Sequence, residues 1–378
     1  MAENLSKYPM NKAIVFLNTA KAWGGGEKWH FEVAQHLYQK GIPVVIVAHP
    51  YSELLKRAQH AGVPVKTLNI GNLNVYWPGK WWQLYQCLKP LCAQTLIINL
   101  SRDLKIGSLV GRWLKIPRII YRRGSSIPIK NSLLNRLIFS YGIDEILANS
   151  IATKKTVNAL HPHLFPQTKI RVIYNGIDTA TFATPTKEVY YQRKSNELVL
   201  THLGRLEREK NQRFLIELAH ELRLRKIPFH LILGGIGSQE ESLKAQVNTY
   251  HLESFVSFVG FVKNPTKLYH SGDLFVLPSL WEGFGYVLAE AGASQKPVIA
   301  FEISSIPEII QDQQTGFLSP LNDVHAFADR VEQLYFQPHF REELGVKAQK
   351  FAQQTFEKKI IFKQIENYLI NKDAASQD

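Results

Sequence analysis

The strongest constraint on the fold is a regular alternation of short apolar runs with helix-like segments. The runs are nearly continuous in Val, Ile and Leu, without the polar alternation of a half-exposed strand. Such runs suit a parallel sheet covered by helices on both faces. The pattern therefore predicts an α/β, doubly wound architecture. The first six expected strands are residues 13–18, 44–48, 95–99, 118–121, 145–148 and 170–174.

A polar stretch without this pattern, residues 183–196, interrupts the series before it resumes. A chain of 378 residues is long enough for two domains. We expect one Rossmann-like domain over residues 1–184 and a second over 185–355. Ligands of such sheets bind beyond the carboxyl ends of strands, so the loops that follow the runs are the places to search. The later expected strands are residues 198–202, 230–233, 256–258, 274–277 and 298–300.

Charge is distributed unevenly between the two expected domains. Residues 1–185 contain 23 Lys and Arg against 8 Asp and Glu, a net charge of +15. The remaining residues contain 22 against 24, a net charge of −2. The basic surplus indicates an anionic partner of the N-terminal domain, such as a phospholipid surface, a phosphorylated glycan or nucleic acid.

The sequence predicts a cytoplasmic protein that can bind peripherally to the inner face of the plasma membrane. Residues 1–10 are polar and lack the apolar core of a secretory signal. The apolar stretches are shorter than the ~20 residues that cross a bilayer. Cys87 and Cys92 are too few for a disulfide scaffold, which suits a reducing compartment.

A glycine-rich loop follows the first expected strand. It contains Gly24, Gly25, Gly26 and Glu27 and leads into a helical pattern. Glycines let backbone N–H groups approach a phosphate or a sugar, and a helix N-terminus adds partial positive charge. The loop therefore predicts a ligand contact or, alternatively, a flexible turn, since the dinucleotide spacing G-x-G-x-x-G is absent.

A second loop combines Gly204 with two cations, Arg205 and Lys210. Arg205 can fork onto phosphate oxygens while Lys210 supplies a point charge, so that together they can neutralise a diphosphate without a metal. The alternative is a solvated helix start. The next two strands are followed by Gly235 and by the pair Gly260 and Phe261. We expect these loops either to face a nucleobase or to be structural turns.

The most specific segment is residues 278–291, which places Glu282 eight positions before Glu290. Glu282 precedes the turn Gly283, Phe284 and Gly285, whose backbone N–H groups can contact a sugar or a phosphate. Glu290 lies about two turns into a largely apolar helix and needs a partner there. A ribose diol can supply that partner, and a buried salt bridge is the alternative.

Together these segments resemble the retaining glycosyltransferases of the group 1 family, often called family 4. That resemblance implies the GT-B architecture, in which two Rossmann-like domains face a cleft, with a C-terminal helix over 356–378 that can pack back on the first domain. The matching segments are residues 25–27, 174–178, 204–205, Lys210, residues 260–261, 282–290 and 297–300.

The resemblance also implies roles for individual residues. Arg205 and Lys210 would hold the donor diphosphate, and Glu290 the ribose hydroxyls. Glu282 and the backbone of residues 283–285 would hold the donor sugar and phosphates, so that Glu282, Arg205 and Lys210 form the expected catalytic group. Gly25 and Gly26, with Glu27 beside them, would contact the donor from the N-terminal domain.

By the same resemblance, the reaction retains the anomeric configuration, with the leaving phosphate helping to deprotonate the acceptor. The expected donor is a nucleotide-diphosphate sugar, with a UDP-sugar favoured, and the expected acceptor is a glycan or a lipid-linked glycan. The setting would be cell-envelope polysaccharide or lipopolysaccharide biosynthesis. We expect no cofactor and no metal, because no Asp-x-Asp pair is present and the two cations can take that role.

One segment departs from the family. Many relatives carry a His after an N-terminal-domain strand, whereas here the expected strand 118–121 leads into Arg122, Arg123 and Ser125. Either an arginine or Ser125 takes part of the role of that His, or the acceptor site is specialised for an anionic substrate. These three residues are therefore the candidates on the acceptor side.

Two segments of the basic domain carry apolar and aromatic residues beside cations. They favour reversible binding to an anionic membrane or, alternatively, ordinary core packing. A nucleotide-sugar epimerase or phosphorylase of GT-B fold and a non-catalytic nucleotide-sugar-binding protein are the competing functions. Nucleic acid is not the expected partner, because the basic domain is not the one with the most ordered ligand motif. The residues of the two segments are Trp77, Lys80, Trp81, Trp82 and Tyr85, and Lys130, Leu133, Leu134, Arg136, Leu137, Ile138 and Tyr141.

Overall fold

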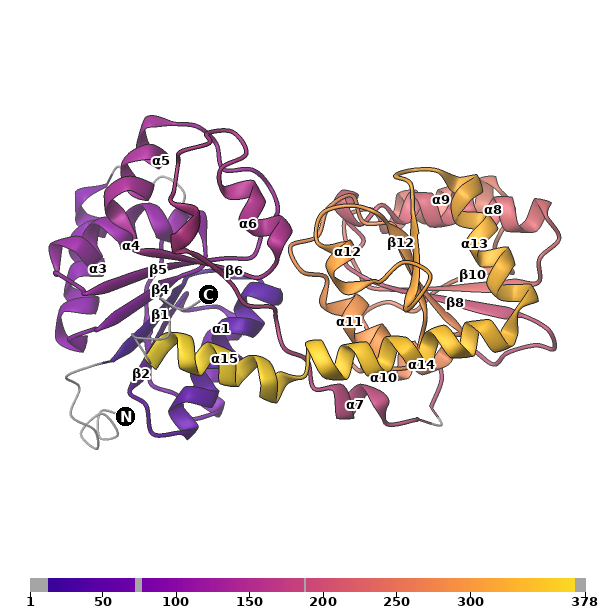
Figure 1. The fold of residues 1–378 in the computed structure, drawn as a ribbon, viewed down its shortest axis with the longest axis horizontal. Coiled ribbons are helices and arrows are strands. Elements are labelled where there is room, and N and C mark those ends of the chain that lie inside the picture. Colours follow the sequence, from indigo (N-terminus) through magenta and orange to yellow (C-terminus); the bar gives the residue numbers. More distant parts are fainter. Residues whose placement is uncertain (1–12, 72–76, 187, 371–378) are drawn as a thin grey trace. The chain divides into compact units, whose positions relative to one another are not determined.

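The computed structural model describes residues 13–71, 77–186 and 188–370, which form two compact units (Figure 1). The first unit takes the described part of Met1–Tyr174 and Phe362–Asp378, and the second is Asn175–Ile361. Residues 1–10, on which the prediction about secretion rests, lie outside the described residues, as do residues 371–378 of the expected C-terminal helix. None of the described helices is long and apolar enough to cross a membrane.

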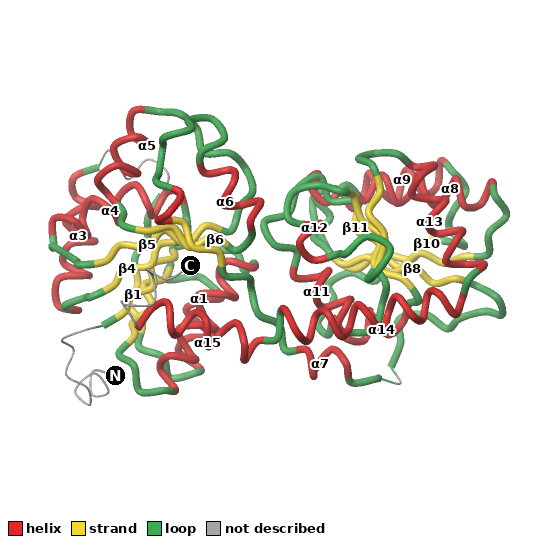
Figure 2. Tube along the Cα trace, in the orientation of Figure 1, coloured by secondary structure: helices red, strands yellow, loops and turns green. Residues whose placement is uncertain are grey.

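The described strands of the first unit form a parallel sheet in the order β3-β2-β1-β4-β5-β6-β7, with helices on both faces (Figure 2). The order reverses between β1 and β4, which is where such sheets bind ligands. The strands are β1 (Ile14–Asn18), β2 (Val44–Ala48), β3 (Val65–Thr67), β4 (Thr95–Ile98), β5 (Arg118–Arg123), β6 (Glu145–Ala148) and β7 (Ile170–Val172). The helical segments are α1 (Gly25–Gln39), α2 (Glu53–His60), α3 (Pro78–Leu88), η3 (Lys89–Leu91), α4 (Ser101–Trp113), α5 (Leu133–Leu137), the π-helix η4 (Ile138–Gly142), α6 (Ile151–Val157) and η5 (Gln167–Lys169).

The second unit repeats this design with the order β10-β9-β8-β11-β12-β13, which reverses between β8 and β11. Its strands are β8 (Leu198–Leu203), β9 (Phe229–Gly234), β10 (Val256–Phe258), β11 (Leu274–Leu277), β12 (Val298–Phe301) and β13 (Gly316–Ser319). Its helical segments are α7 (Thr179–Ala183), η6 (Arg208–Lys210), α8 (Gln212–Leu224), α9 (Glu240–Thr249), α10 (Pro265–Ser271), α11 (Tyr286–Ala293), α12 (Ile306–Ile309), α13 (Val324–Phe336) and α14 (Pro338–Thr355).

The predicted doubly wound, parallel α/β class is confirmed in both units. Every residue of β1, β2 and β4 is buried, as expected for strands covered on both faces. Two edge strands, β3 and β13, lie outside the predicted set, because polar positions interrupt the apolar pattern in them. The prediction that the fourth strand ends at residue 121 is wrong: β5 continues to Arg123, and Arg122 and Arg123 pair with β6.

The two units divide between Tyr174 and Asn175, before the polar stretch at which the sequence places the boundary. The physical reason is that the intervening segment packs on the second unit. Phe182 of α7 lies edge-to-face with Tyr269, their ring centroids 5.9 Å apart, and Tyr191 stacks on His230 at 3.7 Å.

The last described helix, α15 (Lys358–Ile370), belongs to the first unit from Phe362 onwards. The ring of Phe362 packs edge-to-face on His36 of α1, with centroids 5.0 Å apart. Arg118 of β5 donates a hydrogen bond of 2.9 Å to the carbonyl oxygen of Tyr368. These contacts anchor the end of α15 on helix α1 and strand β5.

Candidate functional site

The loops that follow β8, β9, β10 and β11 meet at the carboxyl edge of the second sheet. The backbone N–H of Gly235 donates to the carbonyl oxygen of Gly260 at 2.7 Å, and that of Leu280 donates to the carbonyl oxygen of Glu209 at 2.9 Å. The structure therefore brings together the loops in which the sequence predicts a nucleotide-sugar site.

Gly235 allows the loops after β8 and β9 to lie in contact. It has a φ of +135°, which side-chain-bearing residues rarely adopt, and a Cβ there would overlap the carbonyl oxygen of Gly204. Two of the predicted donor-binding glycines thus lie backbone against backbone. Gly260 has a φ of +64°, with open space where a Cβ would lie.

Lys210 and Glu282 form an ion pair across the switch point of the second sheet, from the loops after β8 and β11. The side chains of Lys210 and Glu282 are 18% and 10% exposed. Ser279 donates a hydrogen bond of 2.8 Å to the same oxygen, Oε1 of Glu282. The pair holds the Lys210 ammonium at the carboxyl edge of the sheet and compensates a largely buried carboxylate.

His202 and Gln212 support the loop that carries these cations. Nδ1 of His202 lies 2.9 Å from the carbonyl oxygen of Val276 and donates to it, so Nε2 accepts from the Gln212 amide at 3.1 Å. That amide also donates to the carbonyl oxygen of Arg205 at 2.8 Å. Burial, together with the charge of Lys210, lowers the pKa of His202 from 6.5 to about 4.

We expect acid to destabilise the second unit through His202. The unfolded histidine binds its proton near pH 6.5 and the folded one only near pH 4, so the free energy of unfolding falls as the pH decreases across this window. The contribution of this group is on the order of 3 kcal/mol. Urea unfolding of the wild type and of His202→Gln at about pH 7 and about pH 4.5 tests this, because the variant should lose less stability on acidification. Equal losses in the two proteins would contradict it.

Arg205 occupies a different position from Lys210. Its side chain is 70% exposed and its Nη2 donates to Oε1 of Glu209 at 2.8 Å. An exposed pair of this kind contributes little to stability, so Arg205 can exchange Glu209 for a ligand phosphate at small cost. The structure does not join Arg205 to the ion pair of Lys210 and Glu282.

Glu290 is buried in α11 and accepts a hydrogen bond of 2.9 Å from the hydroxyl group of Tyr269 on α10. Burial and the nearby carboxylate raise the pKa of Tyr269 well above 10, so the phenol keeps its proton and donates. One partner of Glu290 is therefore Tyr269. The sequence alone suggests a ribose diol or a salt bridge, but not a tyrosine.

Ser305 holds the turn between Glu282 and α11 through two hydrogen bonds. Its hydroxyl lies 3.2 Å from the carbonyl oxygens of both Glu282 and Phe284. Phe284 is buried, and Gly285 caps α11 with a φ of +86°. Gly283 and Gly285 thus lead into the N-terminus of α11, where partial positive charge favours an anion. Phe261, beyond β10, is 72% exposed.

The glycine-rich loop of the first unit is fixed by buried polar contacts. Asp103 accepts hydrogen bonds from the backbone N–H of Thr19 at 2.7 Å and from its hydroxyl at 2.6 Å. Asn18 donates to Oε1 of Glu27 at 3.0 Å, and Gly26 packs so closely on Asn99 that a Cβ would overlap its amide. Gly25 is the first residue of α1. The loop is therefore tightly held by its neighbours, and Glu27 is engaged within it.

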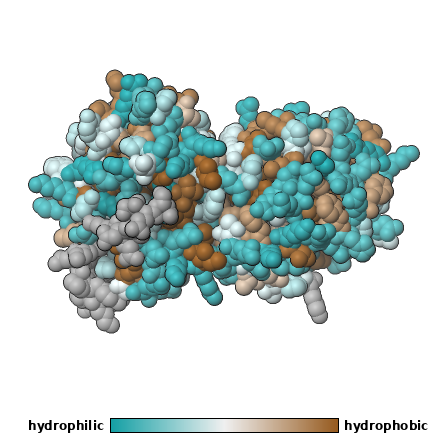
Figure 3. Space-filling view, in the orientation of Figure 1, coloured by the Kyte–Doolittle hydropathy of each residue, from teal (hydrophilic) through white to brown (hydrophobic). Residues whose placement is uncertain are grey.

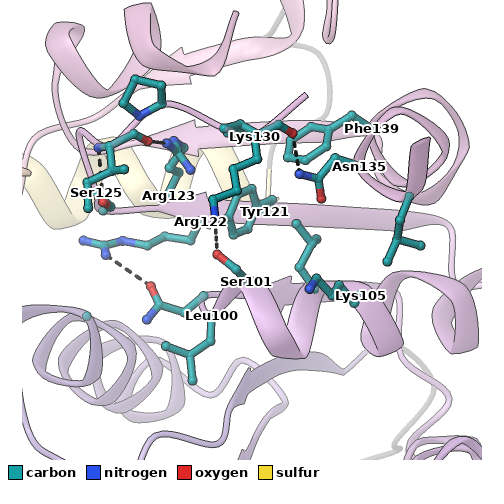
Figure 4. Close-up of a pocket in the computed structure, with 18 of the residues that line it drawn as sticks. Leu100, Ser101, Lys105, Tyr121, Arg122, Arg123, Ser125, Lys130, Asn135 and Phe139 are labelled. Atoms are coloured by element: carbon teal, nitrogen blue, oxygen red, sulfur yellow. Dashed lines mark hydrogen bonds between the residues drawn. The ribbon is translucent and has the colours of Figure 1, made fainter. Parts of the chain in front are cut away.

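A pocket of about 780 Å³ lies at the carboxyl edge of the first sheet (Figure 4). Its walls come from the starts of α1 and α4, the ends of β4 and β5, and the segment 124–139. Five residues of the predicted site line it: Gly26, Glu27, Arg122, Arg123 and Ser125. The structure thus joins the N-terminal glycine loop to the arginine segment.

The acceptor-side candidates are held in different ways. Arg122 donates to Oδ1 of Asn99 at 3.2 Å, and its guanidinium lies 5.0 Å from the centre of the Trp29 ring. Arg123 donates to the carbonyl oxygen of Ile127. Ser125 is exposed, and its hydroxyl accepts from the backbone N–H of Ile127 at 3.3 Å. The two arginines are buried, so their charges lie within the wall of the pocket.

Only some residues of the two apolar and aromatic segments lie in or against the hydrophobic core. Ile138 is buried, and Trp81, Tyr85 and Leu134 pack against the core. The other five are largely exposed, and hydrophobic side chains are visible on the surface of this unit (Figure 3). Tyr85 stacks on exposed Trp82, with ring centroids 5.3 Å apart. We call the five exposed residues the apolar surface: Trp77 (67% exposed), Trp82 (53%), Leu133 (77%), Leu137 (57%) and Tyr141 (75%).

Two family models match adjacent parts of the chain: Glycosyltransferase Family 4 over residues 23–181 and Glycosyl transferases group 1 over residues 185–351. The chain belongs to this glycosyltransferase family. The family 4 glycosyltransferase described here is similar to N-acetyl-alpha-D-glucosaminyl L-malate synthase of Bacillus anthracis, with 27% identity over 68% of each chain. It is also similar to the capsular polysaccharide biosynthesis glycosyltransferase CapM of Staphylococcus aureus, with 25% identity over 59% of this chain and 60% of that protein.

The solved structure of HepE from Anabaena in complex with UDP-glucose has the same fold. It superposes with a TM-score of 0.81 over 94% of this chain and 99% of that chain, at 22% sequence identity. The GT-B fold and the family membership predicted from the motifs are therefore confirmed for this family 4 glycosyltransferase.

Sequence reasoning missed several residues that shape both sites. Ser279 and Gln212 lie beside predicted residues. A single hydroxyl or amide side chain, however, does not mark a functional position when only one sequence is considered. Tyr269 lies on α10, in a segment without a recognised motif. Lys105 lines the pocket of the first unit from α4, just beyond the strand run 95–99. A search of the residues after that run would have found it.

Proposed function

We propose that this glycosyltransferase moves a sugar from a nucleotide-diphosphate sugar, with a UDP-sugar favoured, to a glycan or lipid-linked acceptor. The observation that carries the proposal is the pairing of Lys210 with Glu282 where four loops meet at the edge of the second sheet. The name of CapM supports a role in cell-envelope polysaccharide or lipopolysaccharide biosynthesis. The UDP-glucose complex of HepE supports a UDP-sugar as the donor.

In this proposal the second unit binds the donor through complementary charge. Lys210 and Arg205 bind the diphosphate, with the N-terminus of α11 adding partial positive charge. The leaving diphosphate gains negative charge in the transition state, so fixed cations stabilise that state more than the bound substrate. Glu282 positions Lys210, Glu290 accepts from the ribose, and exposed Phe261 contacts the base.

We further propose that the reaction is metal-independent and retains the anomeric configuration. The bond between the anomeric carbon and the phosphate oxygen breaks, the acceptor oxygen bonds on the same face, and the acceptor proton passes to the leaving phosphate. Because that phosphate acts as the base, the protein needs no nucleophile. Proton NMR of the sugar first released by slow donor hydrolysis checks this, and an inverted anomer would exclude retention.

The binding test uses purified protein, a chelator throughout, and a panel of nucleotide-diphosphate sugars that vary in base and sugar. One donor should raise the melting temperature, because a ligand that binds only the folded state stabilises it. Lys210→Ala should reduce that increase, while Lys350→Ala, which removes an exposed cation of α14, should leave it unchanged. Stabilisation that requires a divalent cation would contradict metal independence.

We also propose that the first unit binds peripherally to anionic membranes through the apolar surface. Exposed aromatic and aliphatic side chains insert at the lipid interface while neighbouring cations, such as Lys80 and Arg136, attract anionic headgroups. Sedimentation with liposomes should show a preference for anionic over neutral lipid, and Leu133→Ser/Leu137→Ser should weaken binding several-fold. Equal sedimentation with both lipids would remove this proposal.

A further inference from the structure

The pocket of the first unit carries a surplus of positive charge. Four cations line it: Arg122 and Arg123 at the end of β5, Lys105 on α4, and Lys130 on the loop before α5 (Figure 4). Glu27 is the one carboxylate among the residues that line the pocket, and it already accepts from Asn18. The lining therefore has a formal charge of +3.

Arg123 carries a part of this charge that no ion pair among the described residues neutralises. The residue is 5% exposed, and its guanidinium contacts the carbonyl oxygen of Ile127 and, at 3.5 Å, the hydroxyl of Thr156. Its Nε is buried without a hydrogen-bond partner. Among the described residues, no carboxylate forms an ion pair with Arg123, Lys105 or Lys130.

A purely structural role accounts for only part of this arrangement. The bond to Ile127 explains why an arginine holds the segment after β5, but a neutral donor would do the same without burying a charge. A buried, unneutralised guanidinium is costly, and the cost falls when an anion binds beside it. Lys105 and Lys130, which come from other segments, add charge to the same cavity.

The remaining lining of the pocket is mixed: apolar side chains lie beside five polar residues, Asn99, Ser101, Ser125, Ser132 and Asn135. Leu100, Leu104, Ile129 and Phe139 contribute to it, together with Leu134 of α5. On the same short helical segment, α5 and η4, three residues of the apolar surface are exposed: Leu133, Leu137 and Tyr141. A cationic pocket and exposed apolar side chains therefore adjoin, and this arrangement complements an amphiphile with an anionic head.

We propose that this pocket binds the phosphate of an amphiphilic acceptor, a phosphomonoester or diphosphate attached to a hydrocarbon chain. The phosphate lies among Lys105, Arg123 and Lys130, and the chain lies along α5. A phosphomonoester carries about −1.5 to −2 charges at pH 7, which offsets the surplus better than one carboxylate does. This inference rests on the proposed function only in calling the ligand an acceptor, since the binding itself needs no donor.

Titration calorimetry with the full chain tests the ligand class with three probes of one chain length: octyl phosphate, octyl sulfate and octanol, each below its micelle concentration. Inorganic phosphate is the fourth probe and separates a free anion from a lipid headgroup. We expect octyl phosphate to bind at least tenfold more tightly than octanol and inorganic phosphate, and more tightly than singly charged octyl sulfate. Octanol binding equally well would overturn the anion site, and inorganic phosphate binding equally well would overturn the amphiphile.

Two variants locate the site. Arg123→Gln and Lys105→Gln should each weaken octyl phosphate binding at least tenfold. Lys169→Gln, which removes an exposed cation of η5 outside the pocket lining, should not change it. Because Arg123 also holds the segment after β5, Lys105→Gln is the decisive variant, and unchanged binding there would overturn the assignment. UDP binding measured on the same samples reports on the second unit, so failure here is distinguishable from failure of the proposed transferase function.

Discussion

Replacing Lys210 with Ala is expected to lower kcat/KM for the donor at least tenfold, which is about 1.4 kcal/mol of lost transition-state stabilisation. The variant lacks the ammonium group that we propose neutralises the leaving diphosphate, and the largely buried Glu282 loses its ion-pair partner. Steady-state assays of donor turnover, with circular dichroism to confirm folding, measure the effect.

The matched control for this prediction is Lys350→Ala, which should leave the kinetics unchanged. A second variant, Glu290→Ala, tests the same site, and its kcat/KM for the donor should fall at least tenfold. If Lys210→Ala and Glu290→Ala both turn over donor at the wild-type rate, the assignment of the donor site to this edge of the second sheet is wrong.

Replacing Gly235 with Ala is expected to destabilise the second unit by about 3 kcal/mol, because an unfavourable backbone conformation and a steric overlap add together. The new Cβ would overlap the carbonyl oxygen of Gly204, which is backbone and cannot rotate away as a flexible side chain can. The loops after β8 and β9 must then separate, so donor binding should weaken as well. Thermal unfolding and UDP titration measure the two effects.

Gly260→Ala is the control that separates these causes. It also introduces a side chain at positive φ, but nothing lies within 4 Å of the new Cβ. Its expected cost is only about 1–2 kcal/mol, that of the left-handed conformation. Equal destabilisation in the two variants would show that the overlap with Gly204 contributes nothing.

The sequence determines most of the fold because interior parallel strands, covered on both faces, must be apolar throughout. β2 and β11, for example, match their predicted bounds. The edge strands β3 and β13 lack that pattern, since pairing on one side tolerates polar residues such as Lys66 and Ser319. The end of β5 could not be predicted, because two arginines normally indicate a loop and here they are buried.

The sequence determines the candidate site of the second unit better than that of the first. Glycines and charged residues after successive strands identify Gly204, Lys210 and Glu282, because strand order brings such loops to one edge. The hydrogen bond between Tyr269 and Glu290 depends on the packing of two helices, which spacing does not encode. The pocket around Arg123 depends likewise on side chains from α4 and from the segment before α5.

The proposed transferase function is tested most directly by turnover of the preferred donor in the presence of a chelator, comparing the wild type with Lys210→Ala. We expect the wild type to release the nucleoside diphosphate and free sugar above the uncatalysed rate, and the variant to lose most of this activity. Tight donor binding without any release would contradict a transferase and indicate a protein that binds nucleotide sugars without acting on them.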